Sequence, residues 1–255
     1  MSELSGKKVI VTGASKGLGL VGARALAAEG ARLALLARSG DALEAARGSL
    51  PEPAAHVAIS ADLTDPRRLR EAVERAREFL GGVDVVLHAA GGGLGLRDPL
   101  LGFDDLLKLF VLNLGVAAEI NRLVVPDMKR AGRGNLVHVG SIASSEGVGS
   151  VGYNTAKAAL AAYVRTLGRE LAGSNIVATG ILPGGFSAPQ NAMERLAANN
   201  PEAYKRFVEE RLPRRVMGEA KELVPMILLL CSSQASMMGG CLVPIDAGEG
   251  RAYAA

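Results

Sequence analysis

Two side chains that can exchange a proton stand four residues apart in the segment YNTAK, residues 153–157. On a helix, positions four apart lie on one face, so Tyr153 and Lys157 would project side by side. An isolated phenol has a pKa of about 10, and a neighbouring ammonium lowers it by favouring the phenolate. Such a pair could pass a proton to a carbonyl oxygen at neutral pH. The spacing is common by chance, so its meaning depends on the rest of the chain.

Two polar residues upstream complete a candidate catalytic set. Ser141 follows the apolar run of VHVGS, twelve residues before Tyr153, and Asn113 lies inside a long helical stretch at 103–131. A hydroxyl at the end of a strand can hydrogen-bond an oxygen on which negative charge develops. The four candidates are Asn113, Ser141, Tyr153 and Lys157.

A glycine-rich turn, TGASKGLG at residues 12–19, follows the first apolar run and opens the first helical stretch. Gly13 permits a tight turn, while Gly17 and Gly19 allow the backbone to approach a pyrophosphate closely. The free N–H groups of the helix N-terminus then face the phosphates. The turn therefore predicts a dinucleotide cofactor, held by Gly13, Ser15, Lys16, Gly17, Leu18 and Gly19.

The end of the second apolar run predicts which dinucleotide binds. An acidic residue there would bind the ribose hydroxyl of NAD, whereas a basic residue accommodates the 2′-phosphate of NADP. The chain reads LALLARSG, with Arg38 at that point and Lys16 in the adjacent turn. Asp41 comes three residues later, where we expect it to cap a helix. The two cations favour NADP.

The elements that must position these residues alternate regularly. Short aliphatic runs occur at 8–12, 32–37, 56–60, 83–88, 135–140, 175–182 and 241–245. Helical stretches lie between them at 17–29, 41–49, 66–80, 103–131, 153–172 and 219–231. The runs are nearly continuous in apolar residues, as in strands buried on both faces. We predict an α/β fold: one doubly wound, Rossmann-like domain over residues 1–255, with about seven parallel strands and helices on both faces.

One insertion departs from this alternation. Residues 187–212 form one or two helical pieces between two predicted strands, after Gly184 and Gly185. Insertions at such a place often cover a ligand crevice. We predict that 187–212 is a lid that is mobile without ligands.

Composition excludes several classes of protein. The chain has 255 residues, of which 49% are hydrophobic, and a net charge of only +3 with scattered basic residues. That balance does not suit nucleic-acid binding. Apolar runs are too short for a membrane span and no signal sequence is evident, so we expect a cytoplasmic protein. The three histidines lack metal-ligand spacing, and we predict no metal site.

The chain resembles the short-chain dehydrogenase/reductase family over essentially its whole length, in the compact branch that includes β-ketoacyl-acyl carrier protein reductases. The features that carry the resemblance are TGASKGLG, Asp62-Leu63, HAAG at 88–91, Asn113, Ser141, Tyr153 with Lys157, and Pro183-Gly184. The resemblance implies NADP(H)-dependent hydride transfer between the nicotinamide and a ketone, keto-ester or 3-oxoacyl-type carbonyl, or the corresponding secondary alcohol. The alternatives are a non-catalytic NADP-binding sensor, and an epimerase or dehydratase acting on sugar nucleotides.

The resemblance also implies roles for individual residues. Tyr153 would be the acid or base, Lys157 would also hold the nicotinamide ribose, and Ser141 would bind the substrate oxygen. Asn113 would hold a water that links Lys157 to solvent. The remaining cofactor contacts would be Asp62 and Leu63 at the adenine, Ala89, Ala90 and Gly91 after the fourth run, and Pro183, Gly184 and Phe186 at the nicotinamide.

The chain departs from the family pattern in three places. His88 and Ala89 stand where two asparagines are usual, and the Ser141–Tyr153 spacing is one residue short. Ala188 replaces a threonine that usually binds the nicotinamide amide, and Ser187 could supply that hydroxyl instead.

The apolar residues of the helical stretches predict self-association. The two long helical stretches carry apolar residues beyond one stripe, namely Leu106, Leu109, Phe110, Val124, Leu160, Tyr163 and Val164. A surplus apolar face suggests a partner. We expect a homotetramer, or failing that a homodimer, as is common in the family.

Overall fold

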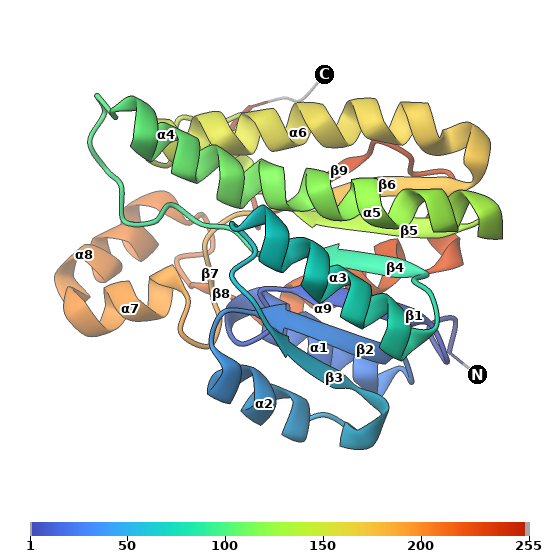
Figure 1. The fold of residues 1–255 in the computed structure, drawn as a ribbon. Coiled ribbons are helices and arrows are strands. Elements are labelled where there is room, and N and C mark those ends of the chain that lie inside the picture. Colours follow the sequence, from blue (N-terminus) through green and yellow to red (C-terminus); the bar gives the residue numbers. More distant parts are fainter. Residues whose placement is uncertain (1, 253–255) are drawn as a thin grey trace.

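Seven parallel strands form the central sheet in the computed structural model, which describes residues 2–252 (Figure 1). The strand order is β3-β2-β1-β4-β5-β6-β9, so the chain reverses direction across the sheet between β1 and β4. The strands are β1 (Lys8–Thr12), β2 (Arg32–Ala37), β3 (Val57–Ser60), β4 (Val85–His88), β5 (Gly134–Val139), β6 (Ile176–Pro183) and β9 (Leu242–Ile245).

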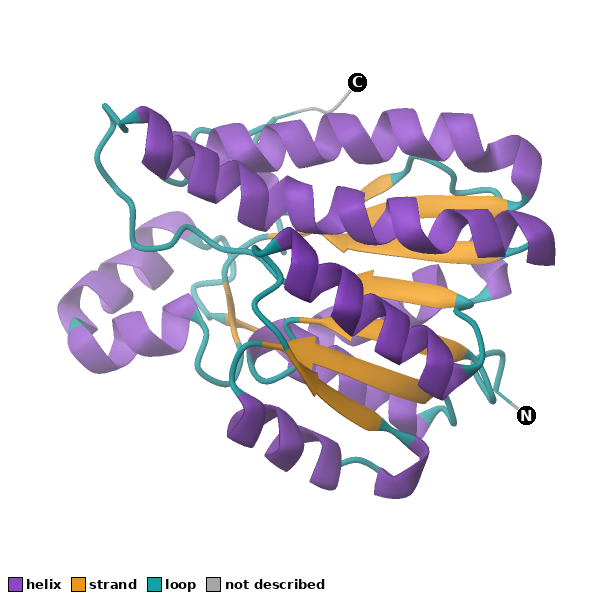
Figure 2. Ribbon diagram, viewed as in Figure 1, coloured by secondary structure: helices purple, strands orange, loops and turns teal. Residues whose placement is uncertain are grey.

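Helices cover both faces of the sheet (Figure 2). One face packs against α1 (Gly17–Ala28), α2 (Gly40–Gly48) and α9 (Ala220–Cys231), and the other against α3 (Pro66–Leu80), α5 (Val116–Ala131) and α6 (Val151–Leu171). Successive strand side chains enter opposite layers, because side chains alternate along a strand. In β1, Val9 and Val11 join the first core while Ile10 joins the second. The predicted fold class, a single doubly wound α/β domain, is confirmed.

Most predicted elements are confirmed, with small differences at their ends. β1, β2 and α3 have the predicted bounds, whereas the long helix at 103–131 is divided into α4 (Phe103–Phe110), a π-helical turn (Val111–Gly115) and α5. The insertion contains α7 (Ala192–Asn199), α8 (Pro201–Arg206) and a second π turn (Phe207–Arg211). It is flanked by two short strands that were not predicted, β7 (Phe186–Ser187) and β8 (Gly218–Glu219), which pair in parallel.

The helix at 103–131 is the one helix within residues 2–252 that is long and apolar enough to cross a bilayer by length and composition. One side of it is a core face: Leu109, Ile120, Val124 and Met128 are fully buried. The apolar content of this helix therefore serves packing against the sheet.

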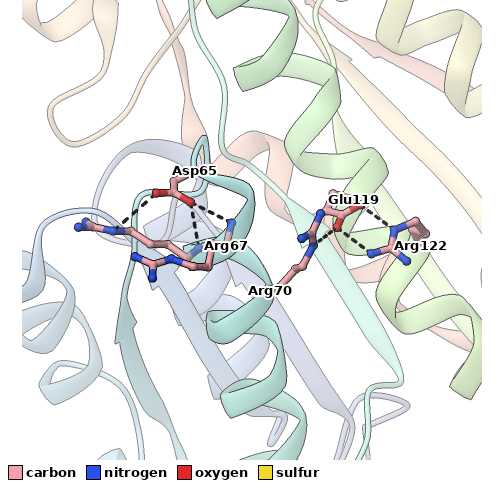
Figure 3. Close-up of polar contacts among 6 residues, drawn as sticks. Asp65, Arg67, Arg70, Glu119 and Arg122 are labelled. Carbon is pink, nitrogen blue, oxygen red and sulfur yellow. Dashed lines mark hydrogen bonds and ion pairs between the residues drawn. The ribbon is translucent and has the colours of Figure 1, made fainter.

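Charged side chains cap α3 and pair it with α5 (Figure 3). Asp65 caps α3 by accepting hydrogen bonds from the backbone N–H of Arg67 (2.9 Å) and Arg68 (3.2 Å). Further along α3, Arg70 Nε donates to Glu119 Oε1 on α5 at 2.8 Å. Hydrogen bonds from Arg122 and Arg70 lower the pKa of Glu119 to about 2. The two helices thus carry a cross-link that persists well below neutral pH.

A polar network lies inside the core at the carboxyl ends of β4 and β5. The rings of His88 and His138 stack with centroids 4.5 Å apart. His88 Nε2 lies 2.8 Å from Asn121 Oδ1, and Asn121 Nδ2 reaches both His138 Nε2 (3.3 Å) and the Tyr163 hydroxyl (3.1 Å). Since an amide oxygen only accepts, His88 must carry its proton on Nε2. Its buried Nδ1 has no hydrogen-bond partner among the described residues.

All three histidines, His56, His88 and His138, are buried. Burial is the main cause that lowers the pKa of His138 from its usual 6.5 to about 4. Burial also lowers the pKa of His88, and the adjacent His138 adds to that effect. Both rings are therefore neutral at physiological pH.

The depressed histidine pKa values predict a loss of stability in mild acid. In the unfolded chain His138 takes up a proton near pH 6.5, whereas in the fold it does so only near 4. The unfolded state therefore binds more protons between these values, and stability falls as pH falls through this window, by about 3 kcal/mol for His138 alone. Urea unfolding at several pH values measures this loss. His138→Gln, which cannot titrate, should flatten the dependence, and an equally steep curve in that variant would refute the assignment.

Candidate active site

The glycine turn between β1 and α1 has the shape that a bound diphosphate requires. Gly13 and Gly17 adopt φ of +66° and +59°, in the left-handed region that favours glycine. A Cβ on Gly19 would stand 2.4 Å from the Gly13 carbonyl oxygen, so only glycine lets α1 begin this close to the turn. Around them Ser15 is half-buried, Lys16 is exposed and Leu18 is buried. The residues present therefore fit a dinucleotide phosphate at the start of α1.

The corner next to this turn is rich in cations. A cavity of about 410 Å³ is lined by Arg38, Ile59, Ser60, Ala61, Asp62, Arg68, Glu71, Ala72 and Arg75. Asp62 Oδ1 accepts hydrogen bonds from the Thr64 hydroxyl (2.7 Å) and backbone N–H (3.0 Å). These bonds, with smaller contributions from Arg38 and Arg68, lower the pKa of Asp62. The predicted neighbours Arg38 and Asp62 thus lie at one cavity, and buried Leu63 follows directly.

Two arginines at this corner were not predicted from the sequence. Arg68 and Arg75 stand seven residues apart on α3 and line the cavity from the same helix face. Their seven-residue spacing could have identified them from the sequence, since it places both side chains on one side of the helix, two turns apart. Asp41, expected as a helix cap, is instead inside the first turn of α2, and Ser39 occupies the capping position. Asp41 does not line the cavity.

The segment after β4 is held to β1 and to the catalytic helix. Thr12 Oγ1 accepts hydrogen bonds from the backbone N–H groups of Ala89 and Ala90, both at 3.1 Å. A Cβ on Gly91 would lie 2.9 Å from Asn113 Oδ1 and 3.3 Å from Lys157 Nζ. These short spacings mean that Gly91 marks where the backbone passes between the two polar side chains.

Asn113 lies in the π turn between α4 and α5 and is buried. Its side chain makes three hydrogen bonds: Oδ1 accepts from Gly92 N–H (3.0 Å), and Nδ2 donates to the carbonyls of Gly92 (3.0 Å) and Leu109 (2.9 Å). The side chain is therefore occupied in fixing the 91–93 backbone. Both Nδ2 hydrogens are therefore used, and a water of the kind that the resemblance implies could be held by the side chain only as a donor to Oδ1.

Tyr153 and Lys157 share one face of α6, as predicted, and Lys157 is buried. Lys157 Nζ donates to the carbonyl of Val139 at 2.9 Å and lies 5.7 Å from the centre of the Tyr153 ring. Ser141 comes two residues after the end of β5, and its hydroxyl accepts from Ala143 N–H at 3.1 Å. A Cβ on Gly149 would come within 2.9 Å of the Tyr153 ring, so the trimmed 142–150 loop packs directly on the phenol.

The ionisation of this pair differs from the sequence-based argument. Burial raises the pKa of Tyr153, and a hydrogen bond with the Ser141 side chain opposes that rise. Burial also lowers the pKa of Lys157 to about 8. Both shifts have one cause, because desolvation disfavours phenolate and ammonium alike. In the protein alone the tyrosine is a neutral acid, and the lysine does not outweigh the effect of burial on it.

The predicted nicotinamide side of the site lies at the end of β6. Pro183 ends this strand, Gly184 follows, and Phe186 is in β7. Ala188, the replacement for a threonine, is buried, whereas Ser187 is half-buried beside it. Pro189 accepts a hydrogen bond from Gly17 N–H at 2.7 Å, so the start of segment 187–212 contacts the glycine turn. In Figure 1, α7 and α8 extend beyond the carboxyl ends of the strands, and Pro183 is at that end of β6.

No group of three His, Cys, Asp or Glu side chains within residues 2–252 could hold a metal ion.

Comparison with known proteins agrees with this architecture. The family model described as short chain dehydrogenase matches residues 7–199. The 2-dehydro-3-deoxy-L-rhamnonate dehydrogenase (NAD(+)) of Sphingomonas sp. (strain SKA58) is 30% identical over 235 residues, covering 91% of this chain and 90% of that protein. The 3-oxoacyl-[acyl-carrier-protein] reductase FabG of Thermotoga maritima is 30% identical over 255 residues, covering 96% and 98%.

A solved structure shows the same fold over nearly the full length. The crystal structure of L-sorbose reductase from Gluconobacter frateurii, complexed with NADPH and L-sorbose, superposes with a TM-score of 0.89 at 29% identity. It covers 98% of each chain. Together with the family match, this similarity means that the chain belongs to the short-chain dehydrogenase/reductase family and is an oxidoreductase of its compact, ketoacyl-reductase-like type.

Proposed function

We propose that this protein is an NADP(H)-dependent oxidoreductase that interconverts a carbonyl and a secondary alcohol. One observation carries the proposal: Ser141, Tyr153 and the buried Lys157 converge at the sheet edge where the glycine turn can bind a dinucleotide. Substrates of this type, a ketone, a keto-ester or a 3-oxoacyl compound, present one oxygen to be protonated. The relatives compared above are named for sugar, sugar-acid and 3-oxoacyl substrates, which share that carbonyl.

The chain's own residues perform the proton chemistry in this proposal. The Ser141 hydroxyl donates a hydrogen bond to the substrate oxygen and orients it, and the neutral Tyr153 phenol then gives that oxygen its proton. Lys157 has a pKa of about 8, so it is mainly an ammonium at pH 7 and stabilises the resulting phenolate. NADPH, when bound, supplies the hydride at the carbon. Gly13, Gly17 and Gly19 would hold its diphosphate, and Pro183, Gly184 and Phe186 would lie at its nicotinamide.

Tyr153→Phe tests this assignment. The variant removes the proton donor but keeps the ring that packs on Gly149, so we expect NADPH binding to persist while kcat falls by roughly 100- to 10,000-fold. The measurement is NADPH oxidation against a panel of ketones and keto-esters. Tyr163→Phe, on the same helix, is the matched control because its hydroxyl bonds Asn121 in the core. NADPH binding without turnover in the unmutated protein would favour the sensor alternative, and near-full activity of Tyr153→Phe would refute the role of Tyr153.

The preference for NADP rests on the arginines of the 410 Å³ cavity. A 2′-phosphate binds guanidinium groups through charge-assisted hydrogen bonds, so Arg38→Asp should move the preference from NADPH toward NADH. Arg68→Ala should weaken the binding of NADPH by about tenfold and change the binding of NADH little, since only NADPH carries the extra phosphate. Arg67→Ala is the matched control: Arg67 is exposed and is not among the cavity-lining residues. Equal affinity of the unmutated protein for the two cofactors would contradict NADP specificity.

We also propose a homotetramer. Of the seven apolar residues first named for it, Leu106, Phe110 and Tyr163 are half-buried. Leu109, Val124, Leu160 and Val164 are buried within one chain and are not available to a partner. Exposed apolar side chains instead gather at the start of α4 and α6: Leu100 (88% exposed), Phe103 (80%), Leu107 and Val151. We expect a tetramer with two-fold axes. Sedimentation at micromolar concentration should give the mass of four chains, and Phe103→Asp should shift it toward smaller species. A monomer of the unmutated chain would end this proposal.

A further inference from the structure

The C-terminal segment places a buried carboxylate at the base of segment 187–212. After β9, Asp246 accepts hydrogen bonds from the backbone N–H groups of Gly248 and Gly250, both at 3.0 Å. Ala247 and Gly248 take positive φ values of 53° and 83°, which close a tight turn. This turn presents Glu249, whose side chain is only 2% exposed. A buried carboxylate is costly unless charged or hydrogen-bonding partners surround it.

The partners of Glu249 come from the two ends of segment 187–212. Its Oε1 pairs with Arg211 Nε at 2.6 Å, in the last turn before Leu212. Its Oε2 accepts the backbone N–H of Gly185, just before the segment begins. A Cβ on Gly184 would come within 2.6 Å of the same oxygen, so a larger residue there would collide with the carboxylate. One side chain thus joins both ends of an inserted segment to the C-terminal turn.

Arg211 extends this connection to the loop that packs on Tyr153. Its Nη1 donates to the Val148 carbonyl at 3.0 Å. Its guanidinium lies 5.1 Å from the centre of the Phe207 ring, and that ring would be 2.9 Å from a Cβ on Gly185. The same loop is tied to the C-terminal segment a second time, because Glu146 accepts the N–H groups of Arg251 and Ala252.

We propose that Glu249 is a positioning residue that couples segment 187–212 to the 142–150 loop, so that the two move together beside Tyr153. The two ends of the segment would then open and close together about the Glu249–Arg211 pair. The proposal rests on the proposed function only in taking the space beside Tyr153 as the carbonyl-binding pocket. Because the buried Glu249 carboxylate accepts from Arg211 at one end and from Gly185 at the other, a change that weakens it as an acceptor should release both ends.

Hydrogen exchange on the intact protein tests the coupling without any substrate. In Glu249→Gln, which keeps the size of the side chain, amides at 184–190 and at 207–212 should exchange about tenfold faster or more, and together. Amides in β5 and β6 should be unchanged. The measurement is made on the free protein and again with NADPH. If the unmutated protein binds no NADPH, the proposed function fails, while the exchange data on the free protein still decide the coupling.

Arginine variants supply the matched control. Arg211→Ala should reproduce the effect of Glu249→Gln, and the double variant should add little to either, since the two residues act through one pair. Arg214→Ala, three residues further on, removes an ion pair with Glu222 of similar length (2.7 Å) whose side chains are 50% and 38% exposed. It should leave exchange at both ends unchanged, because exposed pairs contribute little.

Steady-state kinetics separate positioning from general stability. With the ketone that the unmutated protein reduces fastest, Glu249→Gln should raise KM by about tenfold with a smaller change in kcat, since the pocket loosens but Tyr153 is intact. Loss of protection at one end only, or an unchanged KM with both ends released, would overturn the proposal. Equal loss of protection throughout the sheet would also overturn it, because Glu249 would then be a residue of the fold as a whole.

Discussion

The burial of Lys157 constrains the whole site. An ammonium removed from water must find strong partners, and here the Val139 carbonyl at the end of β5 accepts its hydrogen bond at 2.9 Å. That bond fixes the first turns of α6 against the sheet and sets the position of Tyr153 one turn earlier. The approach also requires Gly91, because a side chain there would meet both Lys157 and Asn113. The catalytic helix, the end of β5 and the segment after β4 are thus held in place around one buried amine.

Parallel strands explain why residues from distant parts of the chain meet at this amine. The carboxyl ends of all seven strands lie at one edge of the sheet, and the strand order reverses between β1 and β4. In such sheets the crevice at the reversal is where ligands bind. The glycine turn follows β1, Gly91 follows β4, Ser141 follows β5 and Pro183 ends β6. Segment 187–212 leaves the same edge, and the Glu249–Arg211 pair ties its ends beside the crevice.

The layer directly behind the site is more polar than an aliphatic core. His88 and His138 stack at the ends of β4 and β5, with Asn121 bridging them and Tyr163 adjoining from α6. His138 immediately precedes Val139, whose carbonyl binds Lys157, and the positive Lys157 contributes to the low pKa of His138. A neutral, hydrogen-bonded pair of rings at this point ties the orientation of the strand ends to helices α5 and α6. The same pair of histidines therefore affects both the stability of the fold in mild acid and the position of the Val139 carbonyl that binds Lys157.

Local signals in the sequence determined the fold and most of the site. Continuous apolar runs, helical periodicity and the glycine turn depend on short-range chemistry, and β1, β2, α3 and the Tyr153–Lys157 face lie where they predict. Tertiary structure alone decided the rest. The hydrogen bonds between Asn113 and Gly92, the pairing of β7 with β8 and the Glu249–Arg211 pair join residues far apart in the chain. Burial decided the ionisation of Tyr153 and Lys157 as well, because desolvation depends on what surrounds a group, and adjacent residues do not reveal those surroundings.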